Sequence, residues 1–425
     1  MKPLSADLRA APAIATALDQ LDQSGADMIA TTKAWSAINS GSRELAGLAR
    51  MADVLGDAFA ALPGHLSRVQ LHPTEAIRAD GARIETPHGE ALRLRVRPEA
   101  PIQVALTGHY DTVFPASSAF QTPFEEPDGR LCGPGVADMK GGLCVMLTAL
   151  KAFEASPGAA AVGYEILLSP DEEIGSPASA VLLAELGRRA HMGMTYEPAL
   201  ADGAIVGARK GSGNFSLALK GKAAHVGRAF ADGRSAIVAA ADAVLRIEAL
   251  NDQREGVTFN CGAIEGGSPV NMVPDGAVVR FNVRAPDAAS RDWALGAVRG
   301  AVEAVAARPG IEATLHGGFG RPPKPLTPAQ EAVIGYVRAM GAALGLDLPV
   351  RASGGVCEGN NLAAVGCANV DTLGPCGGGL HSPDEFALMA TFPERAKLSF
   401  LMLHGLAAGH FDPRTLPRIA AHAHA

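Results

Sequence analysis

Short apolar runs alternate with amphipathic stretches along most of the chain. Apolar residues recur every three or four positions over 45–59, after a turn at 39–42 whose serines would cap the helix that this spacing predicts. The runs at 104–106, 164–168 and 192–195 are short and apolar, and polar residues follow each of them, which predicts buried strands. The alternation predicts an α/β fold with a mostly parallel sheet flanked by helices.

The pattern changes between residues 210 and 320. Here it predicts a strand, a helix, two strands, a helix and a last strand, at 214–219, 235–250, 257–264, 277–284, 288–307 and 311–316. The order β-α-β-β-α-β is the ferredoxin-like, split βαβ arrangement. We therefore predict one domain made of residues 1–209 and 321–425, and an inserted domain made of residues 210–320.

Composition limits the classes of function. Of 425 residues, 48% are hydrophobic and 19% charged, which is typical of a globular chain of more than one domain. The net charge of −7 and the scattered basic residues argue against a nucleic-acid or membrane partner, and favour a small molecule or short peptide. The first twenty residues lack a secretory apolar region, so we expect a cytoplasmic protein with reduced cysteines.

Candidate metal ligands gather in segments that follow predicted strands. These segments are 107–111, 133–138, 169–173, 196–198 and 380–384. In open α/β sheets, ligands bind beyond the carboxyl ends of the strands, and acidic residues crowded there repel one another unless a cation neutralises them. Imidazole and carboxylate ligands suit Zn²⁺, with Co²⁺ or Mn²⁺ as possible substitutes.

These segments, in this order and with an inserted domain between the fourth and fifth, resemble the M20 metallopeptidase family. The pattern is most similar to its glutamate carboxypeptidase (carboxypeptidase G2-like) branch, and the resemblance covers nearly the whole chain. It implies a zinc-exopeptidase-like fold with two zinc ions. By this resemblance, His109 and Glu197 hold one zinc ion, Glu173 and His381 hold the other, and Asp138 bridges the two.

The resemblance also implies the catalytic residues. Asp111 would orient His109, and Glu172 would be the general base that takes a proton from water held between the ions. His225, from the inserted domain, matches a family histidine that stabilises the oxyanion, in many members within the neighbouring subunit. We therefore expect a homodimer that forms through the inserted lid or dimerisation domain.

Four further positions match substrate-binding residues of the family. Asn271 would lie near the substrate, Gly355 belongs to a glycine-rich substrate loop, and Arg284 and Arg321 match arginines that hold substrate carboxylates. A guanidinium pairs with a carboxylate through two parallel hydrogen bonds, which suits an enzyme that recognises a free carboxyl terminus.

The chain departs from the family pattern at two places. Glu358 stands where the family usually has aspartate, and Ala204 and Val206 stand where glutamate-specific relatives carry lysine and serine. Unless Arg209 or Lys210 replaces that lysine, the leaving residue need not be glutamate.

The sequence therefore predicts a dinuclear zinc hydrolase that cleaves an amide bond next to a residue with a free carboxylate, a carboxypeptidase of the glutamate-carboxypeptidase type. An N-acyl-amino-acid amidohydrolase (deacylase) or a dipeptidase of the same family is the alternative. A non-catalytic binding protein is disfavoured because every ligand and the base are present. An RNA-binding role for the inserted domain is disfavoured because interleaved aromatic and basic residues are missing.

Overall fold

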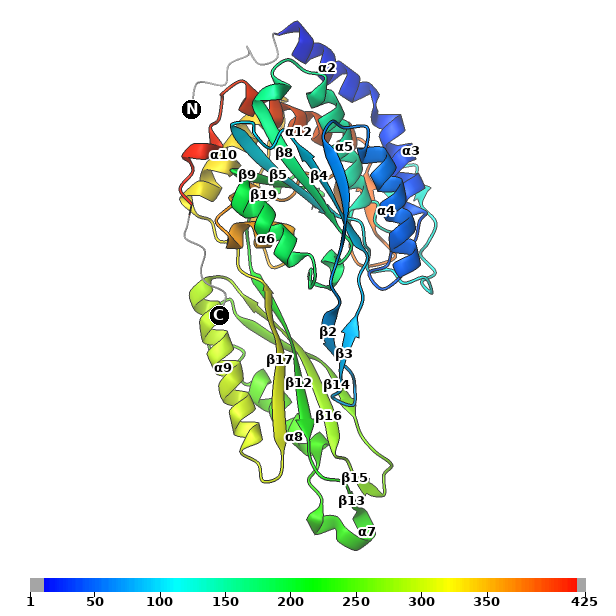
Figure 1. The fold of residues 1–425 in the computed structure, drawn as a ribbon, viewed down its shortest axis with the longest axis vertical. Coiled ribbons are helices and arrows are strands. Elements are labelled where there is room, and N and C mark those ends of the chain that lie inside the picture. Colours follow the sequence, from blue (N-terminus) through cyan, green and yellow to red (C-terminus); the bar gives the residue numbers. More distant parts are fainter. Residues whose placement is uncertain (1–10, 419–425) are drawn as a thin grey trace.

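A mixed six-stranded sheet forms the centre of the larger part of the molecule (Figure 1). The computed structural model describes residues 11–418. In spatial order the strands are β1 (His65–Gln70), β4 (Glu90–Val96), β8 (Val162–Ser169), β5 (Ile102–His109), β9 (Met192–Thr195) and β19 (Asn369–Val370). The strands from β8 to β19 run parallel, and only β4 is antiparallel to its neighbours β1 and β8, so the prediction of a mostly parallel sheet is confirmed.

Helices cover both faces of this sheet, because its inner strands are apolar on both sides. In β5, Val104 and Leu106 join the largest hydrophobic cluster, whereas Ala105 between them joins a smaller cluster on the other face. The large cluster takes residues from α2 (Pro12–Gln23), α3 (Gly25–Ser36), α4 (Leu45–Phe59), α5 (Lys140–Glu154), α10 (Pro328–Ala343) and α12 (Thr391–Ala407). The smaller cluster takes residues from α6 (Ala180–Arg189) and α11 (Glu358–Ala364). Among the helices that the structure describes, none has the length and apolar character needed to span a bilayer.

Shorter elements complete this part of the molecule. A second sheet has the order β10 (Ala199–Leu200), β20 (Cys376–Gly378), β21 (Phe386–Leu388), β7 (Arg130–Cys132) and β6 (Phe124–Glu125). A parallel pair joins β11 (Ile205–Arg209) to β18 (Val350–Ser353). The 3₁₀ turns within residues 11–418 are η1 (Ala159–Ala161), η2 (Glu172–Ile174), η3 (Phe230–Asp232) and η4 (Pro413–Thr415).

The segment between β11 and α10 forms a separate layer with its own hydrophobic cluster (Figure 1). Its elements are β12 (Gly211–Lys220), α8 (Ala236–Glu248), β14 (Thr258–Gly266), β16 (Gly276–Ala285), α9 (Ala288–Ala306) and β17 (Glu312–Arg321). The four strands form one antiparallel sheet in the order β14-β16-β12-β17, on which both helices pack. The predicted order of elements is therefore correct, and we propose that this layer is the inserted domain.

A hairpin that the sequence pattern did not predict connects the two parts. Strands β2 (Thr74–Ile77) and β3 (Arg83–Thr86) extend from the larger part along the inserted sheet (Figure 1). Arg280 Nη2 donates to Ile77 O at 2.6 Å, and Glu75 Oε1 lies 3.2 Å from His316 Nδ1. These contacts fix the inserted sheet against the hairpin and make the hairpin one wall of the space between the two parts.

The two chain crossings between the parts meet at one buried carboxylate. Arg209, which ends β11, and Lys324, which follows β17, exchange backbone hydrogen bonds of 2.9 and 3.0 Å. Asp371 accepts from Arg209 Nε at 2.8 Å, from Arg209 Nη2 at 3.0 Å and from Lys324 Nζ at 2.7 Å. One carboxylate of the larger part therefore holds both connecting segments.

Candidate metal centre

Candidate ligands lie where parallel strands of the six-stranded sheet end. His109 is the last residue of β5, Glu172 and Glu173 form the turn η2 that follows β8, and Glu197 comes two residues after β9. Because these strands are parallel neighbours, their carboxyl ends share one edge of the sheet. The sequence patterns at the strand ends are thereby brought into a single site.

Two loops complete the cluster. Asp138 precedes α5, and its Oδ1 lies 3.1 Å from His109 Nε2 while its Oδ2 lies 3.4 Å from His381 Nε2. His381, in the loop between β20 and β21, lies 3.1 Å from Glu173 Oε2. The Asp138 carboxylate thus stands between two histidines, with one oxygen facing each of them. Ligand atoms of His109, Asp138 and Glu173 all lie within 4.8 Å of one another, close enough to hold one cation.

The buried carboxylates of this cluster favour a bound cation. Burial, and next the charge of Asp138, raise the pKa of Glu173 to about 8 and that of Glu197 well above its ordinary value. Glu197 Oε1 is buried and has no hydrogen-bond partner among the described residues. Hydrogen bonds that the His381 ring donates to Asp138 and Glu173 raise the pKa of His381 to about 11. Buried carboxylates with an unpartnered oxygen, beside imidazole nitrogens, fit a divalent metal.

Asp111 organises the turn that carries the predicted base. Its Oδ1 accepts the backbone N–H of Glu172 and its Oδ2 that of Glu173, each at 3.1 Å, and its Oδ1 lies 3.3 Å from His109 Nδ1. Ser42 Oγ donates to Asp111 Oδ2 at 2.7 Å. The sequence-based expectation that a serine of the turn at 39–42 caps the following helix is wrong. Ser42 instead binds Asp111, and α4 begins after Glu44 without a side-chain cap.

Glu385 is a residue of the site that sequence reasoning missed. Its side chain is buried, and its two oxygens accept the backbone N–H groups of Gly135, Ala137 and Asp138 at 3.0 to 3.2 Å. It therefore ties the loop of Asp138 to the segment that carries His381. The one signal in the sequence was the position of Glu385, four residues after the candidate ligand His381.

A cleft of about 1160 Å³ opens beside the cluster, between the larger part and the inserted sheet. Glu172, Glu173, His381, Arg284, Arg321 and Gly355 line it, together with residues of the hairpin β2–β3. Arg284 Nε donates to Asn282 Oδ1 at 2.9 Å. Arg321, which the resemblance assigns to a substrate carboxylate, has its guanidinium buried against Glu172, with which it forms an ion pair.

His225 and Asn271 lie away from the cluster. His225 ends the short strand β13 (Ala224–His225), and Asn271 directly precedes its partner strand β15 (Met272–Val273), beside α7 (Val226–Ala229), at the far tip of the inserted layer (Figure 1). Neither residue lines the cleft. His225 Nδ1 accepts the backbone N–H of Gly227 at 3.1 Å, and Asn271 O accepts that of Val226 at 3.0 Å.

No cationic side chain lines the cleft at the departing positions Ala204 and Val206 or at the nearby Arg209 and Lys210. Ala204 and Val206 are buried, Arg209 is bound by Asp371, and Lys210 Nζ donates to Gly256 O at 2.7 Å. Neither Arg209 nor Lys210 is among the residues that line the cleft.

Glu358, the second departure, is buried at the start of α11. Its Oε1 accepts from Ser169 Oγ and its Oε2 has no partner among the described residues. Burial raises the pKa of Glu358 to about 7.

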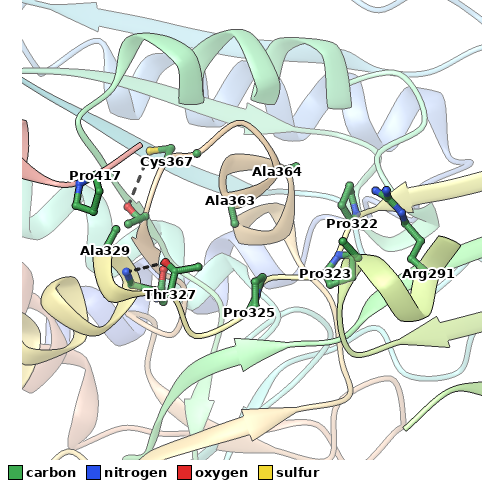
Figure 2. A pocket seen from close by; sticks show the side chains of 14 residues that line it. Arg291, Pro322, Pro323, Pro325, Thr327, Ala329, Ala363, Ala364, Cys367 and Pro417 are labelled. Carbon is green, nitrogen blue, oxygen red and sulfur yellow. Dashed lines mark hydrogen bonds between the residues drawn. The ribbon is translucent and has the colours of Figure 1, made fainter. Parts of the chain in front are cut away.

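A smaller cavity of about 110 Å³ lies where the chain returns from the inserted layer (Figure 2). Pro322, Pro323 and Pro325 line it, facing Ala363 and Ala364 of α11. It shares no lining residue with the cleft, and its walls are mainly apolar. Nothing in its lining resembles the ligand set of the metal cluster.

Comparison with known proteins agrees with this geometry. The sequence profile described as "Peptidase family M20/M25/M40" matches residues 105–404. The chain belongs to this family. It is 26% identical to carboxypeptidase G2 of Pseudomonas sp. over 336 residues, which cover 76% of this chain and 78% of that protein. It is 30% identical to succinyl-diaminopimelate desuccinylase of Bordetella parapertussis, over 67% of this chain and 78% of that protein.

Solved structures agree on the fold. Human carnosine dipeptidase 1 superimposes with a TM-score of 0.70 at 16% identity, covering 93% of this chain and 100% of the other. Family membership makes this M20 protein a metallohydrolase, and the described cluster contains a set of residues able to hold the metal.

Proposed function

We propose that this M20 hydrolase uses two zinc ions to cleave an amide bond next to a residue with a free carboxylate. The observation that carries the proposal is the Asp138 carboxylate, which directs one oxygen toward His109 and the other toward His381. One ion would be held by His109 and Glu197, the other by Glu173 and His381, with Asp138 shared. These nitrogen and oxygen donors suit Zn²⁺, and Co²⁺ or Mn²⁺ would also be accepted.

Bound divalent ions lower the pKa of water and polarise a carbonyl oxygen. Glu172 would take the proton, and this role is supported by its Oε2, which lies 4.0 Å from His109 Nε2 at the edge of the cluster. It would then deliver this proton to the nitrogen of the leaving amine. Asp111 fixes both His109 and the turn of Glu172, so base and ligand keep one relative position.

The leaving residue is recognised by its α-carboxylate. Arg284 lines the cleft, and among the described residues it bonds only to the neutral oxygens of Asn282 and Gly354. No cation occupies the positions where glutamate-specific relatives hold the side chain, so we propose a carboxypeptidase of the glutamate-carboxypeptidase type that accepts non-acidic leaving residues. Hydrolysis of N-acyl amino acids or dipeptides is the alternative, since the relatives include a desuccinylase and a dipeptidase.

We further propose a homodimer in which His225 serves the partner's site. His225 and Asn271 lie at a tip whose neighbours Phe230 and Val270 are exposed at 67% and 101%. Exposed apolar side chains beside a predicted catalytic histidine are what an interface at this tip requires. Mixing Glu172→Gln chains with His225→Ala chains tests this, because a heterodimer would regain one complete site. Two inactive homodimers that regain no activity on mixing would contradict the exchange.

Turnover and metal content test the proposal as a whole. The zinc-loaded protein is incubated with N-acyl amino acids, dipeptides and folate-type glutamates, and the released amines are identified. We expect release from substrates with a free α-carboxylate, loss of turnover by at least about 100-fold in Glu172→Gln, and unchanged metal content. Retained activity in Glu172→Gln, or fewer than two metal ions per chain at saturation, would contradict the mechanism.

A further inference from the structure

Three arginines surround one carboxylate on the face of the six-stranded sheet that α6 covers. Glu165 lies in β8, and each of its two side-chain oxygens accepts two hydrogen bonds. Its Oε1 accepts from Arg93 Nε at 2.6 Å and from Arg189 Nη2 at 3.0 Å. Its Oε2 accepts from Arg95 Nε at 3.2 Å and from Arg189 Nε at 3.3 Å. We call these four side chains the arginine cluster.

The pattern of β4 places two of these arginines side by side. Successive residues of a strand point to opposite faces, and the residues that flank Arg93 and Arg95 belong to the large hydrophobic cluster. Both arginines therefore point to the opposite face. Ala91, on that same face, packs in the smaller cluster with residues of α6, whereas the arginines come after it and meet the last residue of α6, Arg189.

The arginine cluster carries more positive charge than its carboxylate balances. In the described part of the chain, Glu165 is the only carboxylate that forms an ion pair with Arg93 or Arg95. Arg189 has one further partner, Glu185, whose Oε2 lies 3.8 Å from its Nη1. Arg93 Nη2 is buried and has no hydrogen-bond partner among the described residues. Because guanidinium groups held around one carboxylate repel one another, a second anion would stabilise the arrangement.

Such an anion can reach the cluster from solvent. The side chains of Arg95 and Arg189 are each 43% exposed. A hollow of about 430 Å³ lies beside Arg95, and its lining includes His65, which stands opposite Arg95 in the pair of β1 and β4. Arg97 also lines the hollow, but two hydrogen bonds already join it to Glu154. The hollow therefore adds room next to Arg95.

We propose that the arginine cluster binds a phosphate dianion, as inorganic phosphate or as the phosphate group of a small monoester. A guanidinium pairs with phosphate oxygens through two parallel hydrogen bonds. A phosphate group carries a charge of about −1.5 to −2 near pH 7, which matches the excess of three guanidinium groups over one carboxylate. The site is separate from the metal cluster, because Glu165 lies four residues before the end of β8, about 13 Å along the strand.

Titration calorimetry of the metal-loaded protein, freed of unbound metal, tests the proposal. Inorganic phosphate, glycerol 3-phosphate and chloride are compared at constant ionic strength, because salt screens exposed charges. We expect phosphate and its monoester to bind and chloride not to bind. Tighter binding of glycerol 3-phosphate than of inorganic phosphate would identify a monoester as the ligand, and the reverse order would identify inorganic phosphate.

Two variants of equal charge change locate the binding. Arg95→Gln removes an exposed guanidinium of the cluster and should raise Kd for phosphate by at least about tenfold. Arg68→Gln is the matched control, because Arg68 is 42% exposed on the neighbouring strand β1 and is paired with Asp53 and Glu90. It should change Kd by less than about twofold.

Glu165→Gln should act in the opposite direction. Its neutral side chain competes less with phosphate for the three guanidinium groups, so phosphate should bind about tenfold more tightly than to the wild type. Phosphate should also raise the melting temperature of this variant more than that of the wild type. Arg95→Gln carries the test alone where Glu165→Gln does not fold, because it replaces an exposed side chain.

Two results would overturn the proposal. One is the absence of phosphate binding to the wild type. The other is binding that Arg95→Gln leaves unchanged, since the phosphate would then lie elsewhere, for example at the metal ions. Neither result bears on the proposed hydrolase, because Arg95 and Glu165 do not line the cleft beside the metal cluster.

Discussion

Replacing Asp371 should weaken the connection between the two parts of the molecule more than any exposed ion pair does. Asp371 is fully buried and holds Arg209 and Lys324, one from each chain crossing. Burial alone would raise the pKa of Asp371, but the charges of Arg209 and Lys324 lower it below its ordinary value. In Asp371→Asn both cations stay buried and lose their counter-ion.

The size of the effect follows from that burial. Removing one partner of a buried ion pair costs about 3–5 kcal/mol, which is a large share of the roughly 5–15 kcal/mol that stabilises a typical domain. The exposed pair Asp53–Arg68 is a matched control at 2.6 Å, with side chains 63% and 42% exposed. Asp53→Asn should cost at most about 1 kcal/mol. Adding Lys324→Met to Asp371→Asn removes one uncompensated cation and should recover part of the loss.

Urea unfolding followed by tryptophan fluorescence measures this loss in each part separately. Trp35 belongs to the large hydrophobic cluster and Trp293 packs on the cluster of the inserted layer. Two variants, each with one tryptophan replaced by phenylalanine, report on one part of the molecule each. In the Asp371→Asn background, the unfolding transitions of these two variants should occur at different urea concentrations. A stability loss no larger than that of Asp53→Asn, with both transitions still coincident, would refute the role assigned to Asp371.

The pH dependence has a definite sign. The pKa of Asp371 is lowered in the folded state, so its contribution is present above the unfolded value of about 3.9 and is lost as pH falls below it. The difference in free energy of unfolding between wild type and Asp371→Asn should therefore shrink below about pH 4. A difference that stays constant from pH 7 to pH 3 would contradict the assignment.

Three further expectations concern the metal cluster. Glu385→Gln should weaken metal binding by about tenfold to 100-fold, measured by competition with a chromophoric chelator, because an amide N–H₂ group would then face backbone N–H groups; unchanged affinity would contradict its role. Chelation should abolish turnover and lower the melting temperature, and Zn²⁺ at about 1,000 times Kd should restore about 4 kcal/mol; a melting temperature that does not respond to metal would contradict the site. Gly142→Ala places a Cβ 1.9 Å from Tyr196 O, so it should displace α5 from the strand end next to Glu197 and destabilise the protein by about 1–3 kcal/mol; a neutral effect in thermal unfolding would contradict this packing.

Much of the fold was predictable from hydrophobic periodicity. The strands of the inserted layer are half-buried and alternate, as in β16, so their order could be inferred along the chain. The hairpin β2–β3 was missed because β3 is largely exposed and β2 is only four residues long and partly buried, so neither carries a clear apolar pattern. Its contacts, such as that from Arg280 to Ile77 O, are long-range and polar, and periodicity does not encode them.

The residues of the site also differ in whether the sequence pattern indicates them. His109, Glu173 and Glu197 could be proposed as ligands because each lies at or just after the end of an apolar strand, and parallel strands bring their ends to one edge. Glu385 was missed because its partners are backbone N–H groups, which every sequence supplies and none marks. Arg321 was found by resemblance, but its ion pair with Glu172 depends on how the return crossing packs against η2, and only the folded arrangement specifies that.

The two parts of the molecule also meet at the candidate site. Glu172 belongs to a turn of the larger part, whereas Arg321, which forms an ion pair with it, belongs to the last strand of the inserted layer. Because both chain crossings are held by Asp371, this ion pair joins two parts that are already fixed to each other at one buried carboxylate.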